Sequence, residues 1–261
     1  MFHIPILYED DDVLVVNKPA GLIVHSDGRT KEPTLVDWVL EHYPELKDVG
    51  DASIVKSQES AVSDALRPGI VHRLDRETSG ALVLAKNQIA FARLKKQFQR
   101  AQVHKTYHAF VYGSMKHDDG LIDRPIGRSR TNPVLWSATR GRRGEEREAV
   151  TEYRVLSRKG GYTFVELYPK TGRTHQLRVH LKAINYPIVS DRLYAPDLFK
   201  RGAIDDKVES RGTLHSEPAL GFKRLALHSR AISFIQPSTG KRVVVEAPYP
   251  DDFKEAVEQF S

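Results

Sequence analysis

The most closely spaced polar residues of the chain run from His72 to Gly80, in the order H-R-L-D-R-E-T-S-G. Within this string Asp75 stands between Arg73 and Arg76, and nearby cations favour the ionised form of a carboxylate. An ionised carboxylate that is held in place can act as a nucleophile or as a base. Short apolar segments on both sides predict a loop held rigidly over a sheet. On local composition alone, a surface loop whose charges pair with one another is the simpler interpretation.

A second polar string, K-T-G-R-T-H-Q-L-R-V-H, covers residues 170–180. Thr174 is predicted to cap a helix that packs through its leucines. His175, Arg178 and Lys182 then share the opposite face of this helix, where they can direct positive charge toward a cleft. A solvated helix face is the usual meaning of such charges.

The start of the same helix is a candidate phosphate site. Gly172 and Arg173 stand beside it, and the N-terminus of a helix attracts anions. A metal site is not predicted here. His175 and His180 have neither the i, i+4 spacing nor the intervening glutamate of a zinc-protease helix.

Composition narrows the classes of protein further. The 261 residues carry a formal net charge of +6, which suits a polyanionic partner such as a nucleic acid. The absence of cysteine excludes disulfides and thiolate chemistry. Neither a Walker-type phosphate loop nor a dinucleotide fingerprint occurs, which argues against nicotinamide and flavin enzymes. The start of the chain lacks the features of a signal peptide, and no apolar stretch approaches a membrane span, so a cytoplasmic protein is expected.

The elements that must position these residues follow from periodicity and turn signals. Strands are predicted at residues 13–16, 81–85, 105–112, 150–156, 162–168, 231–235 and 243–245. Helices are predicted after the caps Thr34 and Asn87, the second of them reaching Ala101, and again from 174 and from 251. Several strands are joined by hairpins, one through Lys159-Gly160-Gly161 and another through Pro237-Ser238-Thr239-Gly240. Residues 44–68 and 197–217 are polar and are predicted to form loops. The predicted fold class is therefore α+β with a mostly antiparallel sheet.

Residues 124–147 form a separate feature, with seven arginines among Pro, Gly, Ser and Thr and little periodicity. This composition is typical of an arm or loop that contacts phosphates and becomes ordered on RNA. An exposed loop with solvated charges is an interpretation of nearly equal merit.

Five segments in this order resemble the RluA branch of the pseudouridine synthases. The segment from Asp12 to Gly21 (D-V-L-V-V-N-K-P-A-G) resembles the N-terminal motif of that family, and 72–80 resembles its signature loop. Lys105-Thr106-Tyr107 is similar to its K-x-Y strand, 172–180 to its third motif, and 224–228 (R-L-A-L-H) to its late motif. Together these matches span nearly the whole chain.

The resemblance implies a role for each matching residue. Asp75 corresponds to the catalytic aspartate of the family, Tyr107 to the aromatic residue that stacks on the target base, and Arg178 to the arginine that pairs with the catalytic carboxylate. The alternative interpretation of Tyr107 is a purely structural one, an aromatic core residue on a strand. The residues expected to contact the substrate are Arg73, which would fill the space of the extruded base, Leu225 in the uracil pocket, and His72, Arg173 and His175.

The implied activity is the isomerisation of uridine to pseudouridine in structured RNA, with ribosomal RNA favoured and transfer RNA as the other substrate. Similar proteins work without metal or organic cofactor and as monomers. Their fold is a single catalytic domain with an antiparallel sheet bent around a central RNA-binding cleft, here expected over residues 1–261. The first motif lies so early that no N-terminal RNA-binding module of the S4 type is expected.

Two other classes of protein are alternatives to this one. A non-catalytic RNA-binding or RNA-folding protein on the same scaffold would be favoured by an altered residue at position 75, where aspartate is present. A metal-dependent nuclease or phosphatase that uses scattered Asp and His would need clustered carboxylates with ligand spacing, which the sequence lacks. Departures from the family pattern are Ser190 and Ala195, where glycines are expected, and Gln236, where histidine is usual.

Overall fold

The computed structural model describes residues 3–26, 32–50, 67–132, 135–139, 142–201 and 219–261. Its chain forms two compact units, the first made of Met1–Lys105 and Ser229–Pro248 and the second of Thr106–His228 and Tyr249–Ser261. Neither unit is a contiguous half of the sequence, and the expectation of one domain over 1–261 stays a prediction.

The strands of the first unit lie side by side in one sheet, and three of their pairings are antiparallel. β1 (Ile6–Glu9) pairs with β2 (Val13–Lys18), which pairs with β3 (Ser79–Ala85). Next to β3 runs β11 (Leu227–Ile235), which pairs with β12 (Arg242–Glu246) in the hairpin predicted from the sequence. All residues of β3 are buried, so this strand offers apolar side chains to both faces of the sheet.

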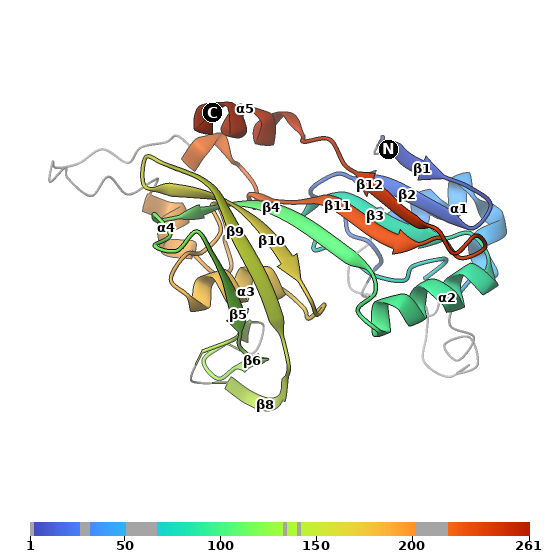
Figure 1. The fold of residues 1–261 in the computed structure, drawn as a ribbon, viewed down its shortest axis with the longest axis horizontal. Helices are drawn as coiled ribbons and strands as arrows, with labels where there is room; N and C mark the ends of the chain where they lie inside the picture. Colours follow the sequence, from blue (N-terminus) through green and yellow to red (C-terminus); the bar gives the residue numbers. More distant parts are fainter. Residues whose placement is uncertain (1–2, 27–31, 51–66, 133–134, 140–141, 202–218) are drawn as a thin grey trace, which may run out of the picture. The chain divides into compact units, whose positions relative to one another are not determined.

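Two helices complete this unit. α1 (Leu35–His42) begins at the predicted cap Thr34, which forms a capping box with Asp37. A 3-10 helix (Pro44–Asp48) follows within the predicted loop 44–68, of which 51–66 lie outside the described residues. α2 (Gln88–Gln99) begins at the predicted cap Asn87 and lies alongside the strands of its own unit (Figure 1).

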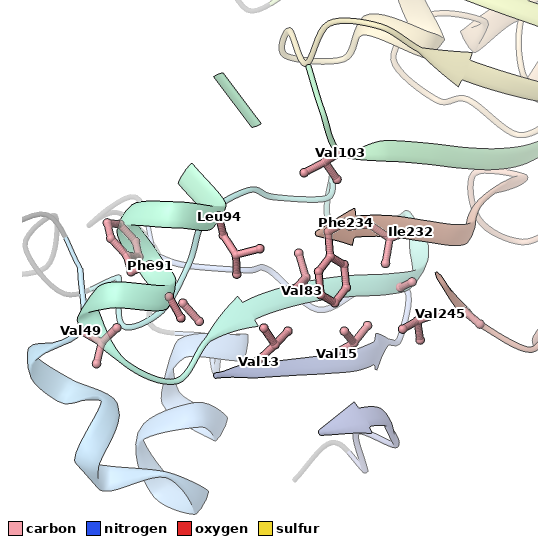
Figure 2. Close-up of a cluster of buried hydrophobic side chains, with 14 residues drawn as sticks. Val13, Val15, Val49, Val83, Phe91, Leu94, Val103, Ile232, Phe234 and Val245 are labelled. Carbon is pink, nitrogen blue, oxygen red and sulfur yellow. The ribbon is translucent and has the colours of Figure 1, made fainter. Parts of the chain in front are cut away.

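Helix α2 is held by an apolar core. Phe91 and Leu94 pack with the buried valines of β2 and β3, as Figure 2 shows. Burial of such side chains is the main source of stability in a domain. The helix ends earlier than predicted, because Ala101 adopts a left-handed backbone with φ 54°.

The second unit is built on four antiparallel strands in the order β4 (His104–Tyr112), β10 (Tyr162–Pro169), β9 (Val150–Lys159) and β5 (Asp119–Asp123). β9 and β10 form the predicted hairpin. Gly160 and Gly161 both have positive φ, 57° and 78°, as a tight two-residue turn requires. The C-terminal helix α5 (Asp251–Phe260) packs on one face of this sheet, where the ring of Phe253 is tilted against Phe110 and meets Phe164 edge-on in an aromatic cluster.

Two further helices belong to this unit, α3 (Gln176–Ala183) and α4 (Pro196–Arg201), with a 3-10 turn at Ala219–Gly221. α3 packs on β10 and on the start of β9. Most of the predicted loop 197–217 lies outside the described residues.

The arginine-rich segment is not the loop that its composition predicted. It folds into a small antiparallel sheet of β6 (Ile126–Ser129), β7 (Trp136–Ser137) and β8 (Arg142–Arg147), with 133–134 and 140–141 outside the described residues. We call this sheet the arm. Its few apolar residues have no periodicity of their own. They share one core cluster with Ala149, α3 and Tyr194, in which Ile126 and Ala138 pack with Val179 and Ala183.

The architecture confirms the predicted α+β class with mostly antiparallel strands. Among the described residues, no helix combines the length and the apolar character needed to cross a membrane.

Candidate active site

Asp75 lies in a loop of the first unit that leads directly into β3. Leu74 before it is buried, and the amide of Thr78 donates to the carbonyl of Asp75 at 3.1 Å. The strand begins at Ser79, and Gly80 follows with φ 111°. A Cβ at Gly80 would lie 2.2 Å from the carbonyl oxygen of Ser229, so only glycine allows β11 to approach this closely. The loop therefore has a fixed C-terminal end.

The first motif holds the other side of this loop through Lys18. This lysine is fully buried, and its Nζ donates to the carbonyls of Pro19 and Leu22, both at 2.8 Å, and of Arg76 at 3.1 Å. The carbonyl of Arg76 also accepts the amide of Gly21 at 2.9 Å. A buried ammonium group is stable only when hydrogen bonds replace its hydration. The residue after Asp75 is thus fixed by a turn that lies far away in the sequence.

We expect Lys18→Met to lower the free energy of unfolding by about 3 kcal/mol, because it leaves buried carbonyl groups without their donor. Urea unfolding of the two proteins measures this difference. Lys86→Met is the matched control. Lys86 forms a partly exposed ion pair with Glu9 at 2.7 Å, and its loss should change stability by less than about 1 kcal/mol. Equal effects of the two substitutions would contradict the role given to Lys18.

The side chains beside Asp75 have different environments. His72 accepts the amide of Val83 at Nε2, at 3.0 Å, and stacks on Phe98 with ring centroids 4.7 Å apart. Burial, and to a smaller extent the charge of Lys105, lowers the pKa of His72 to about 3. A neutral His72 therefore ties the loop to β3, and its predicted contact with RNA stays a prediction.

The two flanking arginines are exposed. Arg76 forms an ion pair with Glu32 at 2.7 Å. Part of the charge in this loop is therefore paired, as expected for a surface loop. Nη1 of Arg73 lies 3.5 Å from Nε2 of His25. An exposed guanidinium two residues before Asp75 is compatible with the role predicted for Arg73.

The remaining predicted site residues lie in the second unit. Tyr107 is buried on β4 opposite Leu167 of β10, and strand alternation places it on the face away from Phe110 and α5. Leu225 is buried as well, and its neighbour Ala226 accepts the amide of Phe110 at 3.2 Å.

The start of α3 differs from the prediction. Its N-cap is His175, which has a left-handed backbone with φ 55°, and not Thr174. The side chain of Gln176 fixes the turn that precedes the helix. Its Oε1 accepts the amide of Arg173 at 3.0 Å and the hydroxyl of Thr171 at 2.6 Å. These bonds tie the first residue of the helix to the turn before it.

The predicted common face of α3 exists, but Tyr194 covers it. The Tyr194 hydroxyl bonds with Nδ1 of His175 at 2.8 Å, and the cationic groups of Arg178 and Lys182 lie 4.9 and 5.7 Å from its ring centroid. Arg178 is buried and not solvated, because Asp191 supplies a buried negative charge. Its Nε and Nη2 donate to the two carboxylate oxygens of Asp191, each at 2.8 Å. Sequence reasoning missed Asp191 and Tyr194, whose only signal was their position shortly after the third motif.

Two other polar residues of this region have structural partners. Arg173 is exposed and donates to the carbonyl of Glu148 at 2.9 Å. His180 is buried between the Thr151 hydroxyl and the Arg124 carbonyl, both at 2.9 Å, and burial lowers its pKa. In the part of the chain that the structure describes, no group of three His, Cys, Asp or Glu side chains could hold a metal ion.

The departures from the family pattern have local explanations. Ser190 has φ 59°, a conformation that favours glycine, and its hydroxyl donates to the carbonyl of Phe222 at 2.8 Å. Gln236 donates to the carboxylates of Asp10 and Asp12 at 3.1 and 3.0 Å. Both side chains are thus satisfied where another residue was expected.

Comparison with known proteins identifies the family of this chain. The family model described as RNA pseudouridylate synthase matches residues 12–183, and the chain belongs to this family. Its motifs and relatives place it in the RluA branch, so the protein is an isomerase, an RNA pseudouridine synthase.

Two relatives and one solved structure illustrate the similarity. The chain is 39% identical to the uncharacterized RNA pseudouridine synthase YlyB of Bacillus subtilis, over 97% of this chain and 71% of that protein. It is 38% identical to the ribosomal large subunit pseudouridine synthase D of Xanthomonas campestris, over 95% and 67% of the two chains. The structure of human RNA pseudouridylate synthase domain containing 1 superimposes with a TM-score of 0.67 and 26% identity, covering 95% of this chain and 84% of that one.

Proposed function

We propose that this enzyme isomerises one or more uridines of ribosomal RNA and that Asp75 is its essential catalytic group. The observation that carries the proposal is the loop at 72–80, in which Lys18 and β3 hold the backbone around an aspartate at the family's catalytic position. Relatives named ribosomal large subunit pseudouridine synthase D support ribosomal RNA over transfer RNA.

The proposed reaction conserves all atoms of the nucleotide. The glycosidic bond between N1 and C1′ breaks, the uracil turns, and a new bond joins C5 to C1′. The proton on C5 is lost and N1 becomes protonated, so no redox cofactor is needed. Three roles are open to the ionised Asp75: attack on the sugar, attack on C6 of the base, or removal of a sugar proton. Each of them requires the carboxylate within reach of the flipped nucleotide.

The target base has to leave its helix before any of these steps. Extruding a paired nucleotide from its helix costs roughly a few kcal/mol of free energy. Stacking on the ring of Tyr107 would return about 1–3 kcal/mol of that cost. Arg73, exposed and close to Asp75 in the chain, would fill the space that the base vacates. Leu225 would line the uracil pocket, and His72, Arg173 and His175 are proposed as further substrate contacts.

The arm offers a surface for phosphates beyond the reacting nucleotide. Arg130 and Arg143 are exposed on it, and the guanidinium of Arg128 lies 4.2 Å from the ring centroid of Trp136. Arginines bound to phosphates displace counterions, which makes RNA affinity depend on salt.

Replacing Arg130 and Arg143 together with glutamine should weaken RNA binding and flatten its dependence on salt. The slope of log affinity against log salt should fall by roughly 1 for each lost phosphate contact. Filter binding of ribosomal RNA at several salt concentrations measures this slope. Arg242→Gln, which removes an exposed arginine of β12, is the control and should keep the parent slope. If the double variant keeps the parent slope, these two arginines of the arm do not contact RNA.

The choice of RNA can be tested in cells. Carbodiimide mapping of pseudouridines with and without the gene should show at least one ribosomal position that disappears with it. If pseudouridines disappear only from transfer RNA, the proposal of a ribosomal substrate is wrong, while the proposed isomerase activity stands. A non-catalytic RNA-folding role on the same scaffold predicts instead that every pseudouridine persists, and that Asp75→Asn restores any growth defect of the deletion.

A further inference from the structure

We propose that Asp191 and Tyr194 are positioning residues for the reaction, which fix the guanidinium of Arg178 and join it to the arm and to β4. The inference rests on the proposed role of Arg178 and deepens it. All contacts that carry it lie within the second unit.

The first step is the fixation of Asp191 itself. Its Oδ1 accepts the amides of Leu193 and Tyr194, both at 3.0 Å, in addition to the Nη2 group of Arg178. Its side chain has no solvent exposure. A buried carboxylate that accepts several N–H groups has one strongly preferred orientation. Asp191 is therefore oriented by its own loop before it orients anything else.

The second step fixes Arg178. The side-on bond to Asp191 uses Nε and Nη2, and the ring of Tyr194 lies against the planar group, 4.9 Å from its carbon. One edge and one face of the guanidinium are thus set by the protein. A guanidinium has five donors, so this arrangement is compatible with a second carboxylate at another edge. That second partner is the role predicted for Asp75.

The third step links this pair to the rest of the unit. Two residues before Asp191, Val189 donates its amide to the carbonyl of Phe110 on β4 at 2.8 Å, three residues beyond Tyr107 in the same strand. The hydroxyl of Tyr194 accepts the amide of Trp136 in the arm at 3.2 Å. A shift of the arm or of β4 is therefore transmitted to Arg178 through Tyr194 and Asp191.

The test measures single-turnover release of tritium from RNA labelled with 5-tritiated uridine, taken from cells that lack the gene. Asp191→Asn should lower the rate at saturating enzyme about 100-fold, the loss typical of a misplaced reacting group, with the half-saturating enzyme concentration nearly unchanged. Tyr194→Phe keeps the ring and removes the hydroxyl bonds, and should cost roughly 3- to 10-fold. It serves as the second variant if Asp191→Asn fails to fold.

A double substitution separates positioning from general stability. In an Arg178→Ala background, Asp191→Asn should cause no further loss of rate, because its only route to the chemistry has gone. The control Asp252→Asn breaks the similar two-bond pair of Arg224 and Asp252, at 2.7 and 2.9 Å, and should keep the parent rate. In NMR spectra, the Nε–H signal of Arg178 should exchange slowly with water in the parent and rapidly in Asp191→Asn.

Each contrary result has a distinct meaning. If Arg178→Ala lowers the rate while Asp191→Asn and Tyr194→Phe keep it, the inference is wrong and the proposed function stands. An equal loss from Asp191→Asn in the parent and in the Arg178→Ala background would also overturn it, since Asp191 would then act by another route. A parent-like rate in Arg178→Ala would overturn the inference together with the proposed role of Arg178.

Discussion

Asp75→Asn is expected to abolish pseudouridine formation while leaving the fold and the binding of RNA largely unchanged. Asparagine has nearly the same shape as aspartate but can neither attack as an anion nor accept a proton. The loop should keep its backbone, because Lys18 and β3 hold it through main-chain atoms. Release of tritium from C5 of labelled uridine in RNA measures the loss, which should amount to at least about 10⁴-fold if one group carries the chemistry.

Two controls make the result specific. Asp48→Asn changes an exposed carboxylate in the same unit and should keep the parent rate. Urea unfolding should give similar stability for Asp75→Asn and the parent, which separates lost chemistry from lost structure. Tritium release by Asp75→Asn at the parent rate would mean that the essential group lies elsewhere.

Arg178→Ala should have the second largest effect, a loss of about 100-fold or more in the single-turnover rate. The substitution removes the cation proposed to pair with the catalytic carboxylate, and it leaves Asp191 buried without its counter-ion. Stability should therefore fall together with activity, and the assay has to be run below the unfolding transition.

Arg178→Lys distinguishes the two consequences of that loss. An ammonium group restores the positive charge but cannot form the side-on pair with both oxygens of Asp191. Stability should recover in part while the rate stays low. Arg158→Ala is the control and should keep the parent rate. This arginine of β9 donates to the carbonyl of Met115 and, like Arg178, forms an ion pair with an aspartate, here Asp118. An unchanged rate in Arg178→Ala would contradict the proposed pairing.

Local sequence patterns predicted the elements of the fold well. The caps Thr34 and Asn87, the buried strand at 81–85 and the glycine pair of the β9–β10 hairpin depend on neighbours within a few residues, and the structure confirms all of them. The predictions that failed depended on distant partners. The arm has too few apolar residues for periodicity, and its core comes from α3 and Tyr194.

The start of α3 shows the same division on a smaller scale. Thr174 is the better cap by intrinsic preference, yet His175 occupies the position. The side chain of Gln176 also donates to the carbonyl of Val150 at 3.0 Å, so the docking of α3 on β9 decides where the helix begins. Tertiary contacts of this kind override single-residue preference because they add hydrogen bonds that a local cap cannot offer.

The sequence by itself determined which residue types are available for chemistry, with Asp75, Tyr107 and Arg178 in motifs that resemble one family. Only the tertiary structure decided that Lys18 is buried against the carbonyl of Arg76 and that Asp191 orients Arg178. The reason is physical. From sequence alone, a charged side chain is expected to be exposed to water. Lys18 and Arg178 are buried instead, because folding packs a distant segment against each of them. Which buried charge meets which partner is a property of the packed chain.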